Sequence, residues 1–118
     1  MDKLSPRVQE QAKFTQDIIK LIGWCFDNGY AVTCGEFLRT PLQQAEYLRT
    51  GRSKTMKSNH LDKRAADLNF FRLSDGKFLS TKEEIAPIGT YWETLDVKNR
   101  WGGNFKSLCD APHFERNI

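Results

Sequence analysis

The sequence SNHLDKRAADLNFF, residues 58–71, contains one of the chain's two histidines and an aspartate seven positions after it. In its second half the residues alternate, so that Ala66 and Leu68 would share one face of a β-strand and Asp67 would lie on the other face. This pattern indicates a sheet that buries one face and carries a carboxylate on the opposite face. Since His60 lies in the loop that leads into the strand, the stretch joins a histidine and a carboxylate at one place in the sheet.

The rest of the chain predicts an α+β fold, a single small domain in which helices flank an antiparallel sheet. Apolar residues at helical spacing, preceded by capping residues and prolines, predict helices at residues 6–28, 40–50 and 80–95. The third of these is expected to begin with a capping box formed by Ser80 and Glu83. Short β-branched or aromatic runs predict strands at residues 30–37 and 65–71, a hairpin from Phe71 to Phe78, and a terminal strand at 113–115.

Length and composition predict one domain over residues 1–118, divided into a helical region at 1–28 and a core at 30–118. The chain has 118 residues, of which 39% are hydrophobic, and this is enough for one core. The N-terminus is polar, and no run of eighteen apolar residues occurs. We therefore expect synthesis in the cytoplasm without a signal peptide, and no membrane insertion.

The three cysteines, Cys25, Cys34 and Cys109, are too few and too scattered for a zinc knuckle or a disulfide framework. We expect them to be reduced and mostly buried, as small apolar side chains.

The formal net charge of +3 is unevenly distributed along the chain. Six basic residues surround the first histidine, with only Asp62 against them: Arg49, Arg52, Lys54, Lys57, Lys63 and Arg64. Such a cationic rim would attract an anionic polymer. Residues 49–64 contain no aromatic side chain on which bases could stack, so nucleic acid is not the expected partner.

Each of the two histidines has a carboxylate near it in the sequence. His60, Asp67 and His113 would supply three zinc ligands if the strand of Asp67 lies beside the strand of His113. A catalytic zinc site also needs a base that takes a proton from the metal-bound water. Asp110, which is separated from His113 by Ala-Pro, is the candidate for this base. Two alternatives stay open, because the histidines could be hydrogen-bonded structural residues and Asp110 a turn residue.

Three segments carry recognisable motifs in one order. Residues 58–67, SNHLDKRAAD, match S-x-H-x-x-G-x-A-x-D except at the glycine, and residues 101–115, WGGNFKSLCDAPHFE, match W-G-G-(aromatic)...D-x-P-H-F-E. Residues 35–55, GEFLRTPLQQAEYLRTGRSKT, match R-(S/T)-x-x-x-Q-x-x-x-(Y/L)...G-x-S. The chain thereby resembles the family of zinc peptidases that contains D-alanyl-D-alanine carboxypeptidases and phage L-alanyl-D-glutamate endopeptidases, whose fold is also described as hedgehog-like or DD-peptidase-like.

The resemblance implies a role for seven residues. It assigns His60, Asp67 and His113 to zinc, and Asp110 to the general base. It also implies that Arg39 stabilises the anionic tetrahedral intermediate, that Ser58 contacts the substrate, and that Trp101 is a wall of the substrate cleft. Arg39 could instead pair with Glu36, Ser58 could form a turn, and Trp101 could belong to the core.

Lys63 stands where the family motif has glycine. If the backbone there needs a positive φ angle, a residue other than glycine costs on the order of 1 kcal/mol. All the expected metal-binding positions are retained, so we expect this departure to affect substrate fit more than catalysis.

The resemblance implies a single zinc peptidase domain, with residues 30–118 as its catalytic core, that hydrolyses peptidoglycan stem peptides. An L-alanyl-D-glutamate endopeptidase, acting as a phage or prophage endolysin, is the leading interpretation, and a D-alanyl-D-alanine carboxypeptidase is the alternative. A non-catalytic zinc-binding or nucleic-acid-binding module is the alternative of another class. The expected partners are bacterial peptidoglycan and a separate holin-like protein that gives a monomeric enzyme access to the cell wall.

Overall fold

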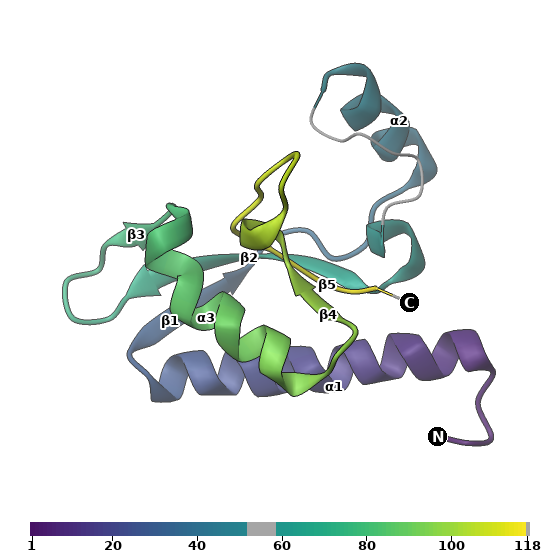
Figure 1. Cartoon of the computed structure of the whole chain (residues 1–118), viewed down its shortest axis with the longest axis horizontal. Coiled ribbons are helices and arrows are strands. Elements are labelled where there is room, and N and C mark those ends of the chain that lie inside the picture. The colour runs from purple at the N-terminus through teal and green to yellow at the C-terminus, as the bar shows by residue number, and fades with distance from the viewer. Residues whose placement is uncertain (52–58, 118) are drawn as a thin grey trace.

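The computed structural model describes residues 1–51 and 59–117, and in these residues five strands form one antiparallel sheet with helices against it (Figure 1). The helices are α1 (Pro6–Asp27), α2 (Pro41–Arg49) and α3 (Lys82–Leu95), with the short 3₁₀ helices η1 (Asn59–Asp62) and η2 (Gly102–Asn104). The strands are β1 (Tyr30–Cys34), β2 (Ala65–Arg72), β3 (Phe78–Leu79), β4 (Asn99–Trp101) and β5 (His113–Arg116). The predicted α+β class is confirmed.

The strand order β1-β2-β5-β4 places β2 and β5 at the centre of the sheet, and β3 pairs with the distal half of β2. In the antiparallel register of β2 and β5, Asp67 lies directly opposite His113. The sheet thus provides the adjacency of strands that the zinc hypothesis requires.

The first and third helices begin at capped N-termini. The Ser5 side chain accepts a hydrogen bond from the Val8 backbone N–H, and a proline follows it at the first helical position. For α3 the capping box consists of Thr81 and Glu84, so the prediction of a box one residue earlier is wrong. The two candidate pairs have the same spacing, and the sequence pattern alone did not fix the register.

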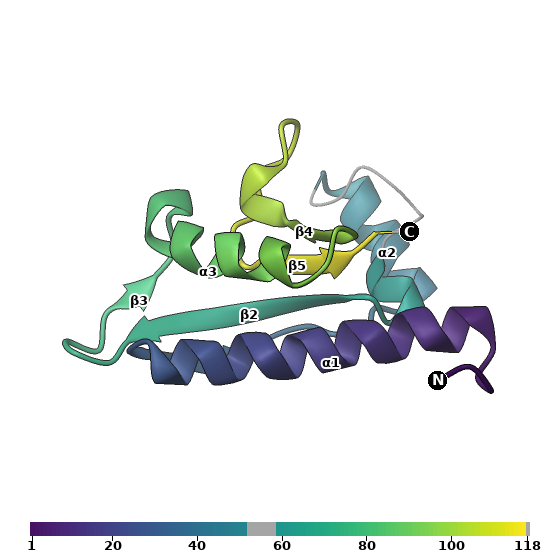
Figure 2. The same cartoon turned by 60° about the horizontal axis from the view of Figure 1, so that its bottom comes forward.

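The hydrophobic core lies between the sheet and the pair α1 and α3. Figure 2 shows α1 running along the length of β2, and the Phe14 ring of α1 meets the Trp92 ring of α3 edge-on at 5.7 Å between centroids. From the sheet, Leu68, Phe70 and Phe114 are buried in the same cluster. Because alternate residues of β2 point to opposite faces, Asp67 lies on the side of the sheet away from this core.

Strand β4 was not predicted. Only three residues form it, and the two glycines that follow it indicated the end of an element rather than a strand. It pairs antiparallel with β5, with Arg100 opposite Glu115. Figure 1 shows α2 standing apart from α1 and α3.

The expectation of mostly buried cysteines is wrong. All three are free, but only Cys25 is buried, and Cys34 and Cys109 are exposed. Cys34 ends β1 at the edge of the sheet, and Cys109 lies in the loop after η2, so neither reaches the core. Within the described residues, no helix has both the length and the apolar character needed to cross a bilayer.

Candidate metal and active site

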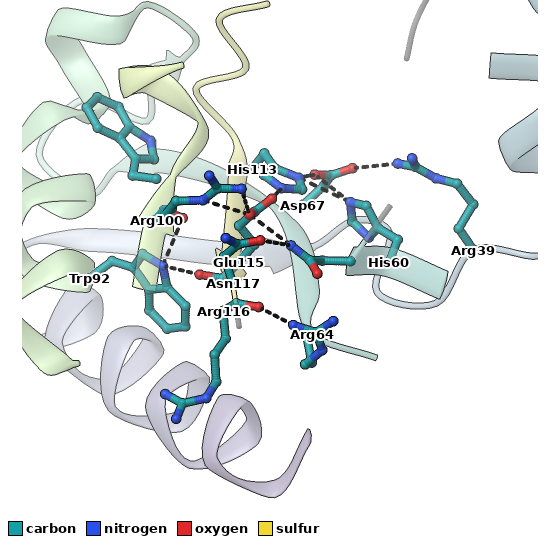
Figure 3. Close-up of polar contacts among 12 residues, drawn as sticks. Arg39, His60, Arg64, Asp67, Trp92, Arg100, His113, Glu115, Arg116 and Asn117 are labelled. Carbon is teal, nitrogen blue, oxygen red and sulfur yellow. Dashed lines mark hydrogen bonds and ion pairs between the residues drawn. The ribbon is translucent and has the colours of Figure 1, made fainter. Parts of the chain in front are cut away.

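Three side chains from three different elements meet on the face of the sheet that lies away from the hydrophobic core. His60 comes from η1, Asp67 from β2 and His113 from β5, and Figure 3 shows their polar atoms turned toward one another. His60 Nε2 lies 3.2 Å from His113 Nδ1 and 3.4 Å from Asp67 Oδ1, and the third side of the triangle, from His113 Nδ1 to Asp67 Oδ1, is 3.2 Å.

This triangle has the dimensions of a zinc site. With zinc–ligand distances of about 2.0–2.1 Å, the edge of a coordination tetrahedron is about 3.3 Å. The three observed separations fall within 0.2 Å of that length. Two imidazoles and one carboxylate also form a ligand set that zinc accepts in catalytic sites, where a fourth position is left for water or substrate.

The second nitrogen of each histidine has an acceptor of its own. His60 Nδ1–H donates to the backbone carbonyl of Phe37 at 3.1 Å, and His113 Nε2–H donates to Glu115 Oε1 at 2.7 Å. Because a carbonyl and a carboxylate only accept, they keep the proton on the outer nitrogen of each ring. In these neutral tautomers both inner nitrogens present lone pairs to each other and to Asp67, and a bound cation would offset the repulsion among the three acceptors.

The pKa values of Asp67 and His113 show how strongly their charges interact when the inner nitrogens carry protons. Burial alone would raise the pKa of Asp67, but hydrogen bonds from His113 and His60 outweigh it and hold that pKa well below its usual range. Burial alone would lower the pKa of His113, but hydrogen bonds to Asp67 and Glu115 raise it to about 9. The site therefore stabilises an anionic carboxylate and positive charge around the second histidine.

Asp110 begins a tight turn that leads directly into His113. The Asp110 backbone N–H donates to Gly102 O at 2.9 Å, and the His113 backbone N–H donates to Asp110 O at 3.0 Å. A Cβ atom at Gly102 would lie 2.1 Å from Asp110 O and 2.8 Å from the Cβ of His113. Only glycine lets η2 approach the turn this closely, so Gly102 sets the position of both residues.

The Asp110 carboxyl is half-buried in the electrostatic field of the site. Its pKa is raised, first by burial and then by the negative charge of Asp67, while His113, His60 and Arg39 oppose the rise. A carboxylate with a raised pKa holds a proton more readily than a free one, which is the property needed in a general base. The charges of Asp67, His113 and His60 thus all act on the pKa of the Asp110 carboxyl.

Arg39 approaches the same cluster from the segment between β1 and α2. Its Nη2 lies 4.0 Å from Asp67 Oδ2. Its Nε donates to Glu36 at 2.5 Å and its Nη1 to Gln44 at 2.6 Å, and its guanidinium lies 4.6 Å from the ring centroid of Tyr47. The ion pair with Glu36, which the sequence analysis gave as the alternative to a catalytic role, is present, and it holds the guanidinium beside the site.

Trp101 lies buried beside the turn that leads to His113. Trp101 is only 2% exposed, and its Nε1–H donates to Ala111 O at 2.7 Å in the turn after Asp110. Its position favours support of the turn over an exposed cleft wall.

Lys63 has a φ angle of 58°, the only positive value at a non-glycine among the described residues, so the motif glycine coincides with a left-handed backbone. Ser58, the other expected substrate contact, lies outside the described residues.

Glu115 and Gln44 are the site residues that the sequence analysis missed. Glu115 is 5% exposed and contacts the outer nitrogen of a candidate ligand, and Gln44 is fully buried against Arg39. A signal for Glu115 was available, because residues two apart on a strand share one face and metal-binding histidines commonly donate to a carboxylate. For Gln44 the only signal in the sequence was that it occupies the glutamine position of the motif at residues 35–55.

The chain is similar to a phage peptidase, to a solved bacterial endopeptidase structure and to one protein family. It is 32% identical over 100 residues to an L-alanyl-D-glutamate peptidase of a Listeria phage, an alignment that covers 83% of this chain and 34% of the relative, so the chain spans about a third of the length of that protein. Its structure resembles that of the Serratia marcescens L-Ala D-Glu endopeptidase with a TM-score of 0.69 and 24% identity, over 97% of this chain and 89% of the other. A family model described as D-alanyl-D-alanine carboxypeptidase matches residues 51–116. Because that model spans more than half of the chain, the chain belongs to this family of peptidases.

Proposed function

We propose that the protein is a zinc-dependent peptidase that hydrolyses peptidoglycan stem peptides between L-alanine and D-glutamate. The observation that carries this proposal is the triangle of His60 Nε2, Asp67 Oδ1 and His113 Nδ1, with sides of 3.2–3.4 Å. The names of the Listeria phage relative and of the Serratia structure support the choice of bond.

His60, Asp67 and His113 would hold the zinc ion. When bound in such a site, zinc polarises a peptide carbonyl and lowers the pKa of a coordinated water. The protein contributes rigidity, because each ligand sits on a different element and two of them are fixed by hydrogen bonds to Phe37 and Glu115.

Asp110 and Arg39 would perform the two remaining tasks. Asp110 would accept the proton of the attacking water and return it to the leaving amine. Arg39 would stabilise the negative charge that develops on the carbonyl oxygen, and its ion pair with Glu36 and its bond to Gln44 preorganise it for this purpose. A fixed guanidinium loses no conformational freedom when the charge appears.

A D-alanyl-D-alanine carboxypeptidase is the second candidate, and the description of the matching family favours it. The same metal site would serve both reactions. They differ in the substrate, since a carboxypeptidase must also recognise a free terminal carboxylate.

The partners and the place of action follow from the substrate. Peptidoglycan carries many carboxylates, and the formal net charge of +3 favours its approach. We propose that the protein acts as a monomer on the bacterial cell wall after release from the cytoplasm, and that a separate holin-like protein permits that release.

Digestion of purified peptidoglycan, with fragments identified by mass spectrometry, tests the proposal. Zinc-loaded protein should create new L-alanine carboxyl ends and D-glutamate amino ends. A chelator should abolish them, and Asp110→Asn should lower the rate by a factor on the order of 10²–10⁴. Asp75→Asn is the matched control, because Asp75 lies in the exposed turn before β3 and pairs with Arg72.

Each result has a definite meaning. Release of terminal D-alanine alone would assign the protein to the carboxypeptidases. If folded, zinc-loaded protein cleaves no wall preparation of any peptide chemistry, the proposal of a peptidase acting on peptidoglycan is wrong.

A further inference from the structure

Beyond the three candidate ligands, the carboxylate of Glu115 accepts hydrogen bonds at both of its oxygens. We propose that Glu115 is a positioning residue that commits His113 to metal binding through Nδ1, and that Arg100 and Asn59 hold Glu115 in the orientation that does so. This inference rests on the proposed metal site and adds a second layer of residues to it.

Each oxygen of Glu115 has a separate task. Oε1 accepts the Nε2–H of His113 at 2.7 Å. Oε2 accepts from Asn59 Nδ2 at 2.8 Å, and from Arg100 Nε at 3.0 Å and Nη2 at 2.6 Å. Figure 3 shows Arg100 and His113 reaching the same carboxylate from two sides. The carboxylate therefore cannot rotate without breaking several hydrogen bonds.

The sheet produces this arrangement directly. Glu115 lies two residues after His113 on β5, so both side chains project from one face. Arg100 lies opposite Glu115 in the register of β4 and β5. Asn59 immediately precedes His60 in η1, so the same carboxylate connects the strand of the second histidine to the segment that carries the first.

The two histidines face the site through different nitrogens, His60 through Nε2 and His113 through Nδ1. For His113 to offer a lone pair at Nδ1, its proton must be on Nε2, and an acceptor at that nitrogen selects this tautomer. A carboxylate in this position also makes the imidazole a stronger ligand. The guanidinium of Arg100 compensates the charge of Glu115, which is 5% exposed.

Replacement of Glu115 by glutamine should reverse the preference. Arg100 and Asn59 both donate, so they would keep the amide oxygen on their side and turn the amide NH₂ toward His113 Nε2. A donor facing Nε2 favours the tautomer with the proton on Nδ1, which blocks metal binding there. Glu115→Gln should therefore weaken zinc affinity by about 10–100-fold in a competition with a chromogenic chelator, and should alter the visible spectrum of the cobalt-substituted protein.

Two further variants separate positioning from stability. Glu10→Gln is the matched control, because Glu10 bonds Arg116 of the same strand at 2.5 Å but belongs to α1 and contacts no candidate ligand; it should lower thermal stability and leave zinc affinity unchanged. In Glu115→Gln combined with Arg100→Met, the amide can turn its oxygen toward His113, so the double variant should recover part of the affinity lost by the single one. A purely structural role for Glu115 would make the double variant worse.

A measurement on the unmodified protein does not depend on the folding of any variant. Long-range ¹H–¹⁵N correlation spectra of the zinc-loaded protein should show His113 protonated at Nε2 and His60 protonated at Nδ1. A His113 proton on Nδ1, or Glu115→Gln with the zinc affinity and cobalt spectrum of the wild type, would overturn the inference. Zinc-loaded wild type that shows the expected tautomers but cleaves no peptidoglycan would instead refute the proposed function alone.

Discussion

At the scale of single residues, Lys63 shows how a motif glycine can be replaced without loss of the fold. Its φ angle of 58° lies in the left-handed region, which a lysine adopts at a cost of about 1–2 kcal/mol. The residue joins η1, which carries His60, to β2, which carries Asp67. The strain therefore lies between two candidate metal ligands, and the backbone has the left-handed conformation that the glycine of the motif would adopt without strain.

Lys63→Gly should stabilise the protein. Glycine removes the left-handed strain but adds freedom to the unfolded chain, so the net gain in the free energy of unfolding should be about 0.5–1 kcal/mol. Urea denaturation of the two proteins measures it. A loss of stability would show that the lysine side chain makes contacts that outweigh the strain.

At the scale of elements, η2 and the turn after it determine where Asp110 and His113 lie. The backbone of Gly102 accepts the Asp110 N–H, and its missing side chain leaves room for the turn. On the other side, Trp101 fixes Ala111 through its indole N–H. In the motif at residues 101–115, Trp101 and Gly102 thus serve mainly to let two backbone segments pack closely together.

Gly102→Ala should impair the site more than the fold. The added Cβ would lie 2.1 Å from a backbone oxygen, so the turn must move, and overpacking of this kind costs about 1–3 kcal/mol. Zinc affinity and peptidoglycan cleavage should fall together. Gly23→Ala, at a position in α1 with no atom within 4 Å of the added Cβ, should slightly stabilise the protein; equal zinc affinity in both variants would contradict the account.

The capping box of α3 gives the fold an acid-sensitive contribution. The pKa of Glu84 is lowered from 4.5 to about 2, first by the hydrogen bond from Lys77 and then by the backbone N–H groups of Thr81 and Ser80. A carboxylate with a lower pKa in the folded state contributes stability that is fully present above pH 4.5 and is lost as the pH falls toward 2. The wild type should therefore be more stable than Glu84→Gln at neutral pH, and the gap in the free energy of unfolding should narrow between pH 4.5 and 2. A gap that is constant with pH would refute this role.

The sequence predicted individual helices and strands more reliably than it predicted which strands pair in the sheet. Alternation in β2 gave its buried face correctly, since Ala66, Leu68 and Phe70 are in the core. The three residues of β4 carry too little pattern to be recognised, and without β4 the partner of Glu115 could not be foreseen. Pairing of distant segments depends on the whole sheet, and the spacing of residues along the chain does not encode it directly.

At the scale of the whole molecule, the candidate metal site connects parts of the chain that are far apart in sequence. Residues 60, 67 and 113 belong to η1, β2 and β5, so a bound ion would join these elements. Because the unfolded chain has no such site, binding free energy adds to folding free energy.

Removal of zinc should therefore destabilise the folded protein. At a free zinc concentration of 100 times the dissociation constant, the gain in the free energy of unfolding is about 2.7 kcal/mol. Thermal unfolding with zinc and with chelator measures it, and His60→Ala should abolish the difference. An identical transition temperature with and without zinc in the wild type would contradict a site of this kind.

Zinc K-edge X-ray absorption of the loaded protein tests the central claim most directly, since it reports which atoms surround the ion. The account predicts one zinc per chain with only nitrogen and oxygen neighbours at about 2.0–2.2 Å, two of them imidazoles, and loss of one imidazole contribution in His113→Ala. A shell at about 2.3 Å from a cysteine sulfur, or bound zinc without imidazole scattering, would place the metal elsewhere and contradict the account.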